Sequence, residues 1–180
     1  MRQGRIVGTG ELVDREVRGG LRLRTARPEE AGYLSELAMR SKAHWGYTAD
    51  FMAACRDELS VSPTDVSDPL NDYQVAVLDG RVAGFCGLVP HIDNEYELDG
   101  LFVEPDSIGA GIGRRLLRRA CELLAGRRIE SLFIQSDPNA DAFYESMGAV
   151  CVGRQLSASI PGRYLTTYRL AVGERAGVES

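Results

Sequence analysis

The chain has 180 residues, of which 44% are hydrophobic and 26% are charged, and its formal net charge is −5. These values are ordinary for a soluble globular protein, and the length is sufficient for one domain with a sizeable core. No apolar run approaches the roughly 20 residues that span a bilayer. The acidic balance argues against a surface that coats nucleic acid.

The first 20 residues contain no long apolar core, so they are not a secretory signal, and their glycines and arginines are typical of a flexible extension. We expect a single domain over residues 21–172 and a short tail over 173–180. The chain contains four cysteines without a CxxC pair and two histidines, so metal-site spacing is missing and no metal is expected. Free thiols are typical of a reducing compartment, and we expect a cytoplasmic protein.

The first half of the chain predicts a strand followed by two helices. Alternation over 21–25 favours the strand, and Pro28, with two acids after it, opens a helix that runs to about Lys42. Thr48 is a candidate cap for a second helix, whose apolar face carries Phe51, Met52, Cys55 and Leu59. Residues 60–72 are interpreted as a loop.

The second half of the chain predicts most of a sheet. Asp79-Gly80 joins two apolar runs as a hairpin. The expected strands are 73–78, 81–89, 96–103, 129–135, 149–155 and 164–172, and the expected helices are 111–125 and 139–147. This order predicts an α/β fold of three layers, α-β-α, with a mixed, mostly antiparallel sheet of about six to seven strands.

The stretch from Leu101 to Leu117 reads LFVEPDSIGAGIGRRLL and joins a strand to a leucine-faced helix. Its glycines let backbone N–H groups approach a ligand closely, and a helix N-terminus adds partial positive charge. Together they form an anion site that suits phosphate. The stretch lacks both GxGxxG and GK[ST], which argues against a dinucleotide-binding oxidoreductase and against a nucleotide P-loop.

This stretch resembles the acyl-coenzyme A loop of the GNAT superfamily of N-acetyltransferases, and the matching residues are Leu101, Val103, Pro105, Gly109, Gly111 and Gly113. It departs from the family pattern at Ile108, where an Arg or Gln is usual. A second motif, Asp137 to Ala149, resembles the family's [ND]-x-x-A-x-x-F-Y-x-x-x-G-[FA] helix. The resemblance covers roughly 21–172, and 40–58 resembles the acceptor-side helices of one bacterial branch.

The resemblance implies a GNAT-like fold, acetyl-coenzyme A (acetyl-CoA) as co-substrate, and a set of residues that bind it. It also implies an oxyanion-binding backbone N–H near Phe102 and Val103. Because Ile108 offers no cation, the phosphate grip is expected from the loop backbone and Arg114. The expected binding residues are Leu101, Phe102, Val103, Ile108, Gly109, Ala110, Gly111, Ile112, Gly113, Arg114, Asn139, Ala142 and Phe143.

Three side chains are candidates for catalysis. The resemblance implies that Tyr144 is the general acid that protonates the leaving thiolate, and the alternative is a packed core aromatic. Glu97 and Asp99 stand two apart on one predicted strand, so they are expected on one face. Glu97 resembles the family's strand base and Asp99 ranks second, while a water relay or a purely acceptor-binding role remains open.

The acceptor is expected to be the primary amine of a small molecule or peptide. His44, Trp45 and Tyr47 could line its pocket, although Trp45 could equally anchor a core and His44 is more often a surface or core histidine. Arg163 precedes the last strand, where relatives of this family build the far side of the acceptor cleft, and a surface turn at Pro161-Gly162 is the simpler alternative. Residues 44–106 carry thirteen acids against two arginines, a balance of −11, which favours a cationic acceptor or simply a solvated face. No nucleic-acid or membrane partner is expected, and a homodimer through late strands is possible for a relative of this family.

These features together predict an enzyme that moves an acetyl group from acetyl-CoA to an amine by direct attack in a ternary complex. Departure from the family pattern at Ile108 motivates one alternative, a non-catalytic acyl-CoA sensor on the same fold. Retention of Tyr144 and Glu97 argues against that alternative.

Overall fold

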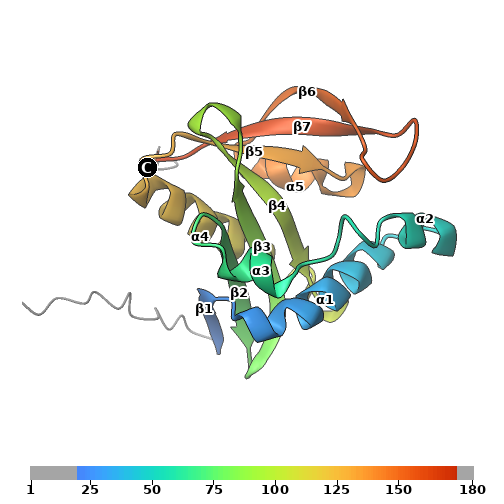
Figure 1. The fold of residues 1–180 in the computed structure, drawn as a ribbon, viewed down its shortest axis with the longest axis horizontal. Helices are drawn as coiled ribbons and strands as arrows, with labels where there is room; N and C mark the ends of the chain where they lie inside the picture. Colours follow the sequence, from blue (N-terminus) through green and yellow to red (C-terminus); the bar gives the residue numbers. More distant parts are fainter. Residues whose placement is uncertain (1–19, 174–180) are drawn as a thin grey trace, which may run out of the picture.

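The computed structural model describes residues 20–173, so nearly all of the expected extension and tail lies outside the described residues. A seven-stranded sheet forms the middle layer, with strand order β1-β2-β3-β4-β5-β7-β6 (Figure 1). The strands are β1 (Leu21–Thr25), β2 (Asp72–Leu78), β3 (Arg81–Pro90), β4 (Tyr96–Val103), β5 (Ser131–Ser136), β6 (Val150–Leu156) and β7 (Tyr164–Ala171). All neighbours are antiparallel except β4 and β5, which confirms the mixed, mostly antiparallel sheet.

Helices cover both faces of this sheet. They are α1 (Ala31–Ala43), α2 (Ala49–Ala54), α3 (Pro63–Ser67), α4 (Ile112–Gly126) and α5 (Asp141–Ser146). Short 3₁₀ turns are η1 (Pro28–Glu30), η2 (Ile92–Asn94), η3 (Pro105–Ser107) and η4 (Pro138–Ala140). No helix within residues 20–173 is long and apolar enough to cross a membrane.

Two hydrophobic cores lie on opposite faces of the sheet and make the predicted three layers. One core packs Leu34 and Leu37 of α1 and Met52 of α2 against β2 and β3. The other packs α4, through Leu116 and its neighbours, together with Tyr144 of α5 against the opposite face. The sheet is therefore packed between helices on both of its faces.

The interpretation of residues 60–72 as a loop was wrong for Pro63–Ser67, which form α3. Ser62 accepts from the Asp65 backbone N–H, and the Asp65 carboxylate accepts from the Ser62 N–H. This capping box, with Pro63 in the first turn, stabilises a helix of a single turn. The second predicted helix is shorter than expected and ends at Ala54, although Cys55 and Leu59 beyond it are still buried.

The parallel pairing of β4 with β5 is short and ends at Leu98 opposite Ile134. Beyond this point the last four residues of β4, 100–103, pair only with β3, so β4 and β5 separate. A bulge lies at the same place, because Leu98 pairs with Leu88 and Gly100 pairs with Gly87, which leaves Asp99 as the extra residue. The separation exposes one edge of β4, and the bulge re-aims Asp99.

Candidate active site

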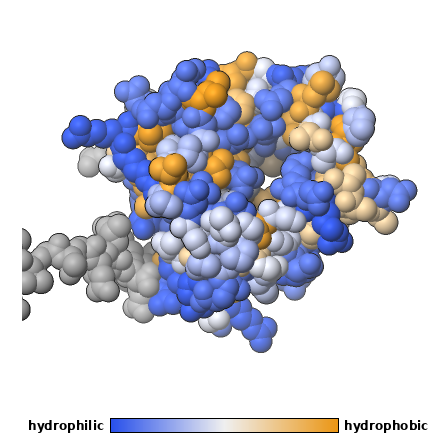
Figure 2. Space-filling model, in the orientation of Figure 1, coloured by the Kyte–Doolittle hydropathy of each residue, from blue (hydrophilic) through white to orange (hydrophobic). Residues whose placement is uncertain are grey.

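A cavity of about 260 Å³ lies where β4 and β5 separate. Its walls come from α1 and the α1–α2 connection, the turns after α2, β4, β5, η4, α5, the β6–β7 connection and β7. The expected site residues that line it are Trp45, Glu97, Asp99, Leu101, Phe102 and Tyr144. On the molecular face in Figure 2, hydrophilic residues dominate and hydrophobic ones form small scattered groups. The cavity is a candidate site for a small ligand.

The glycine loop before α4 presents free backbone N–H groups at the start of a helix. Gly109 and Gly111 have φ angles of 88° and 79°, a left-handed conformation that costs about 1–2 kcal/mol in other L-residues. Within residues 20–173, five backbone N–H groups here have no hydrogen-bond acceptor: those of Gly109, Gly111, Ile112, Gly113 and Arg114. The first turn of α4 contains no acid, so the helix dipole and these donors together favour a polyanion.

The start of α4 meets β4 and α5 at Gly113. A Cβ atom on this glycine would lie 3.4 Å from Leu101 Cδ2 and 3.6 Å from Phe143 Cζ. Phe143 in turn packs edge-on against Tyr144, with 5.1 Å between the ring centroids. The structure thus brings the glycine loop, Leu101 and Phe143 together, as expected, whereas Ile108 is 39% exposed and Ala142 is exposed on α5.

One N–H on the exposed edge of β4 is free to bind an oxyanion. The Glu104 N–H donates to Ala83 O of β3, and the Val103 N–H donates to Ser41 Oγ at 3.3 Å. Because successive N–H groups of a strand alternate between its two edges, the Phe102 N–H faces β3 and the Leu101 N–H faces the open edge. Near the expected position at Phe102 and Val103, the Leu101 N–H is therefore the backbone donor that the strand geometry leaves on the open edge.

Tyr144 lines the cavity and is also part of the core below α4. Only 6% of the residue is exposed, and the hydroxyl has no hydrogen-bond partner among the described residues. Burial raises the pKa of this hydroxyl above its ordinary value, with smaller contributions from Cys86 and Asp137. Tyr144 therefore stays protonated and is available as a proton donor.

Asp99 lies at the point where the strands separate. Its Oδ2 accepts from the Tyr73 hydroxyl at 2.7 Å. Desolvation raises the pKa of the Asp99 carboxyl, the Tyr73 hydrogen bond lowers it in part, and the charges of Asp65 and Glu58 raise it further. Gly87 makes this contact possible, because a Cβ there would lie 2.6 Å from Tyr73 Cε1.

Glu97 also lines the cavity, but both of its carboxylate oxygens are engaged. Oε1 accepts from Gln135 Nε2 at 2.6 Å, and Oε2 lies 3.3 Å from His91 Nδ1. The His91 ring is stacked on Phe133, with 4.6 Å between centroids. Glu97 is thus held in one orientation, while Asp99 keeps Oδ1 without a partner within the described part of the chain.

The three residues expected to bind the acceptor have different surroundings in the structure. Trp45 lines the cavity and is 46% exposed. Tyr47 stacks on Phe51, with 4.1 Å between centroids, and turns its hydroxyl toward Asp137. His44 is exposed, packs edge-on against Trp45, and is not part of the cavity wall.

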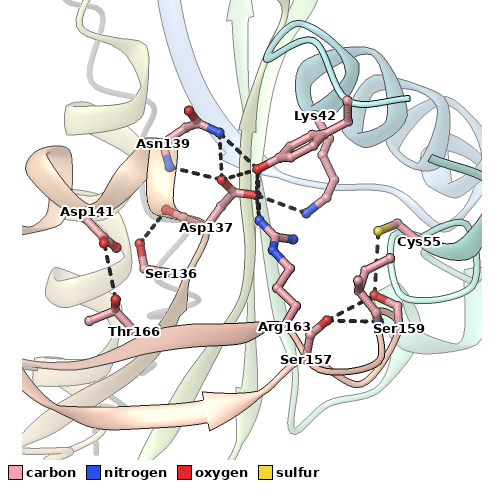
Figure 3. Close-up of polar contacts among 12 residues, drawn as sticks. Lys42, Cys55, Ser136, Asp137, Asn139, Asp141, Ser157, Ser159, Arg163 and Thr166 are labelled. Atoms are coloured by element: carbon pink, nitrogen blue, oxygen red, sulfur yellow. Dashed lines mark hydrogen bonds and ion pairs between the residues drawn. The ribbon is translucent and has the colours of Figure 1, made fainter. Parts of the chain in front are cut away.

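Asp137 is the centre of a polar network that closes one side of the cavity (Figure 3). Its carboxylate accepts from Tyr47 at 2.8 Å and Arg163 at 3.1 Å, and it pairs with Lys42 at 3.3 Å. Burial opposes ionisation, but the Asn139 backbone N–H, Tyr47, Lys42 and Arg163 lower the pKa of Asp137 to about 2. The Asp137 carboxylate is therefore ionised, and the positive charges of Lys42 and Arg163 balance it.

Some of these residues carry little signal in the sequence. Asn139 is expected to bind the co-substrate, and in the structure its side chain donates to Tyr47 and to Asp137, each at 3.0 Å. Lys42 and Tyr73 belong to no motif, and Asp137 enters only as the first position of the second motif. The motif restricts that position to Asn or Asp, and this restriction is the signal in the sequence that marks Asp137 as a site residue. Within residues 20–173, no group of three or more His, Cys, Asp or Glu residues is arranged to hold a metal ion.

Comparison with known proteins identifies the family. The family model described as "Acetyltransferase (GNAT) family" matches residues 33–149, well over half of the chain. The chain therefore belongs to the GNAT family of acetyltransferases. It is an N-acetyltransferase that uses acetyl-CoA as donor. A search of curated protein sequences gave no significant match.

Many solved structures share the fold. A GCN5-related N-acetyltransferase from Rhodopseudomonas palustris aligns with a TM-score of 0.71 and 24% identity over 87% of this chain and 98% of the other. The PaiA N-acetyltransferase of Thermoplasma acidophilum, solved with coenzyme A, aligns with a TM-score of 0.62 and 18% identity over 83% and 99%. An aminoglycoside 6'-N-acetyltransferase complexed with coenzyme A aligns with a TM-score of 0.65 and 18% identity over 86% and 99%. At these identities the structures support the fold.

Proposed function

We propose that the protein transfers an acetyl group from acetyl-CoA to a primary amine of a small molecule or peptide, by direct attack in a ternary complex. One observation carries the proposal. The unpartnered Tyr144 hydroxyl and the Asp99 carboxyl share a cavity, and the open Leu101 edge of β4 lines that cavity too. A proton donor, a proton acceptor and an oxyanion donor are the three groups that acyl transfer to an amine needs.

We assign the donor to the glycine loop and the open edge of β4. The free N–H groups between Gly109 and Arg114 fit the diphosphate of a coenzyme, and Arg114 adds the charge that Ile108 does not supply. We assign the arm that carries the thioester to the residues of β4 and α5 near this loop. These residues are Leu101, Phe102, Val103, Ala142 and Phe143. Holding both substrates in one geometry supplies a large share of the rate.

We assign the proton transfers to Asp99 and Tyr144. The contacts favour Asp99 over Glu97 as base, because its pKa is raised and one of its oxygens is free, whereas Glu97 is held by Gln135 and His91. Asp99 takes a proton from the amine as the nitrogen attacks the thioester carbonyl, and the Leu101 N–H stabilises the oxyanion. When the C–S bond breaks, Tyr144 gives its proton to the leaving sulfur.

Three further expectations complete the proposal. The free cysteines, of which Cys55 and Cys86 are buried, fit a cytoplasmic protein. A small-molecule or peptide acceptor fits a cavity of about 260 Å³ better than nucleic acid or a membrane would. A homodimer through the late strands is supported by β6, an edge strand whose residues are all exposed.

Replacement of Tyr144, the proposed general acid, tests the proposal. Tyr144→Phe removes the hydroxyl and should lower kcat by roughly 100-fold or more, with little change in the KM for acetyl-CoA, because general acid catalysis contributes about 10²–10⁴. Release of the coenzyme thiol over a panel of amines is the measurement. Tyr168→Phe is the matched control, since Tyr168 is also a buried tyrosine, bonds to Glu145, and is not part of the cavity wall.

The same experiment separates the enzyme from the sensor that Ile108 motivates. A sensor would bind acetyl-CoA in calorimetry and release no thiol with any amine. Equal kcat in Tyr144→Phe and the natural chain would remove Tyr144 from catalysis.

A further inference from the structure

Ser41 is a polar residue that is buried in the wall of the cavity. It lies near the end of α1, is only 7% exposed, and lines the cavity together with Leu101, Phe102 and Tyr144. A hydroxyl that is buried this deeply costs free energy unless both its oxygen and its proton find partners. The hydrogen bonds of Ser41 therefore bear on its role.

Only the oxygen of the Ser41 hydroxyl has a partner. Ser41 Oγ accepts from the Val103 N–H at 3.3 Å, and within residues 20–173 the hydroxyl donates to no acceptor. Other serines of the region use their protons, because Ser35 on the same helix donates to a backbone carbonyl and so does Ser136 of β5. Ser41 therefore keeps one hydrogen-bond donor available at the cavity wall.

Ser41 lies beside the open edge of β4, at the position of the Leu101 N–H. Val103 and Leu101 are two residues apart, so their N–H groups lie on the same edge, about 7 Å from each other. Ser41 Oγ lies 3.3 Å from the Val103 nitrogen. Since two hydrogen bonds of about 2.8 Å span the remaining distance, one oxygen atom can accept from both the Leu101 N–H and the Ser41 hydroxyl.

The contact with Val103 also makes Ser41 a stronger donor. A hydroxyl whose oxygen accepts a hydrogen bond gives its own proton more readily to the next acceptor, because the two bonds polarise each other. Burial strengthens the effect, since few water molecules compete for the hydroxyl at this position. A negative oxygen atom that develops during a reaction is the acceptor that gains most from such a donor.

We propose that the Ser41 hydroxyl is a second donor to the oxyanion, beside the Leu101 N–H. This inference rests on the proposed function and adds a catalytic residue to it. When the amine nitrogen attacks the thioester carbonyl, the carbonyl oxygen becomes negative and accepts from both groups. Ser41 keeps its proton throughout. When the carbonyl forms again and the C–S bond breaks, the sulfur takes its proton from Tyr144.

Ser41→Ala tests the inference. The variant should lower kcat by roughly 100-fold, the usual effect of removing one oxyanion donor. The Kd for acetyl-CoA should stay near that of the natural chain, because the lost interaction forms mainly in the transition state. Thiol release with the best amine of the panel gives kcat, and calorimetry gives the Kd. Alanine is favoured in a helix, so the variant should fold, and Tm checks this.

Infrared spectroscopy of bound acetyl-CoA, labelled with ¹³C at its carbonyl, separates a donor from a residue that only holds β4 in place. In Ser41→Ala the carbonyl band should lie at higher frequency than in the natural chain, because one hydrogen bond to the carbonyl oxygen is missing. Ser41→Thr keeps the hydroxyl, so it should keep the band position and most of kcat.

Ser35→Ala is the matched control. Ser35 belongs to the same helix, but it lies outside the cavity wall and its hydroxyl bonds to the backbone of Ala31 and Val61. This replacement should lower Tm and leave both kcat and the carbonyl band unchanged.

The outcomes separate this inference from the proposed function. If Ser41→Ala keeps the kcat of the natural chain, or loses kcat without a shift of the carbonyl band, Ser41 is not an oxyanion donor, and acetyl transfer through Tyr144 is unaffected. If the natural chain binds acetyl-CoA but acetylates no amine of the panel, both the inference and the proposed function are wrong.

Discussion

Asp99 and Tyr73 set the pH range in which the proposed base can act. Because the pKa of Asp99 is already raised, kcat/KM should fall on the acid side at a pH above the ordinary range of aspartate. Tyr73→Phe removes the hydrogen bond that lowers this pKa, so the acid limb of the profile should move to higher pH. A pH profile of kcat/KM is the measurement.

Tyr33→Phe is the control for that profile, because Tyr33 also donates to a carboxylate, Glu104, but lies outside the cavity wall. An acid limb that stays in place in Tyr73→Phe contradicts the role of Asp99.

Asp99 should affect the pH dependence of stability in the direction opposite to that of most acidic residues. A carboxyl whose folded pKa is raised adds stability at low pH and loses it as pH rises through that pKa. Asp99→Asn should therefore not lower Tm near pH 7.

Single residues could be predicted from the sequence where a motif fixes them. Tyr144 and the loop glycines follow from two motifs of defined spacing. Tyr73 could not be found in this way, because its contact with Asp99 depends on a bulge and on a glycine of the strand between them. The contact of Tyr47 with Arg163 joins residues 116 positions apart, and no local pattern encodes it.

At the scale of elements, the glycine loop and α4 were predictable because backbone geometry demands their residue types. Gly109 and Gly111 take left-handed angles, and the apolar residues of α4 recur with helical spacing. The one-turn helix α3 was missed although Ser62 and Asp65 carry the signature of a capping box, because Pro and Ser nearby favour a loop. The end of β4–β5 pairing is set by tertiary packing and leaves no such signature.

The loop also yields a prediction about donor affinity. Ile108 is partly exposed in extended backbone beside the free N–H groups, so an arginine can replace it without a clash in the core. Ile108→Arg should tighten coenzyme A binding by roughly two- to fivefold, the value of an exposed ion pair, and the gain should fall with salt. Calorimetry gives the Kd. Ile108→Gln, which is polar but neutral, is the control, and an equal gain there argues against an electrostatic effect.

At the scale of the whole molecule, the hydrogen bonds and ion pairs of Asp137 connect segments that the sheet does not join. The members of this network come from α1, the α1–α2 connection, η4 and the β6–β7 connection, and Figure 3 shows them meeting at Asp137. The same β6–β7 connection packs Ile160 against the core under α1 and α2. The network therefore joins α1 and the α1–α2 connection to the β6–β7 connection beside the cavity.

Asp137→Asn should reveal this role as a loss of stability. The pKa of Asp137 is about 2 in the folded chain against 3.8 for a free aspartate, and one pKa unit corresponds to about 1.4 kcal/mol. The ionised carboxylate thus contributes roughly 2 kcal/mol, fully present above the unfolded pKa and lost as pH falls from about 4 to about 2. Urea unfolding of both chains should show this difference near pH 7 and a smaller one near pH 2, where a protonated carboxyl resembles the amide. Asp57→Asn, exposed and without an ion pair in the described part of the chain, should unfold like the natural chain at both pH values. A gap that stays constant with pH would instead assign the loss to packing around Asp137 rather than to its charge.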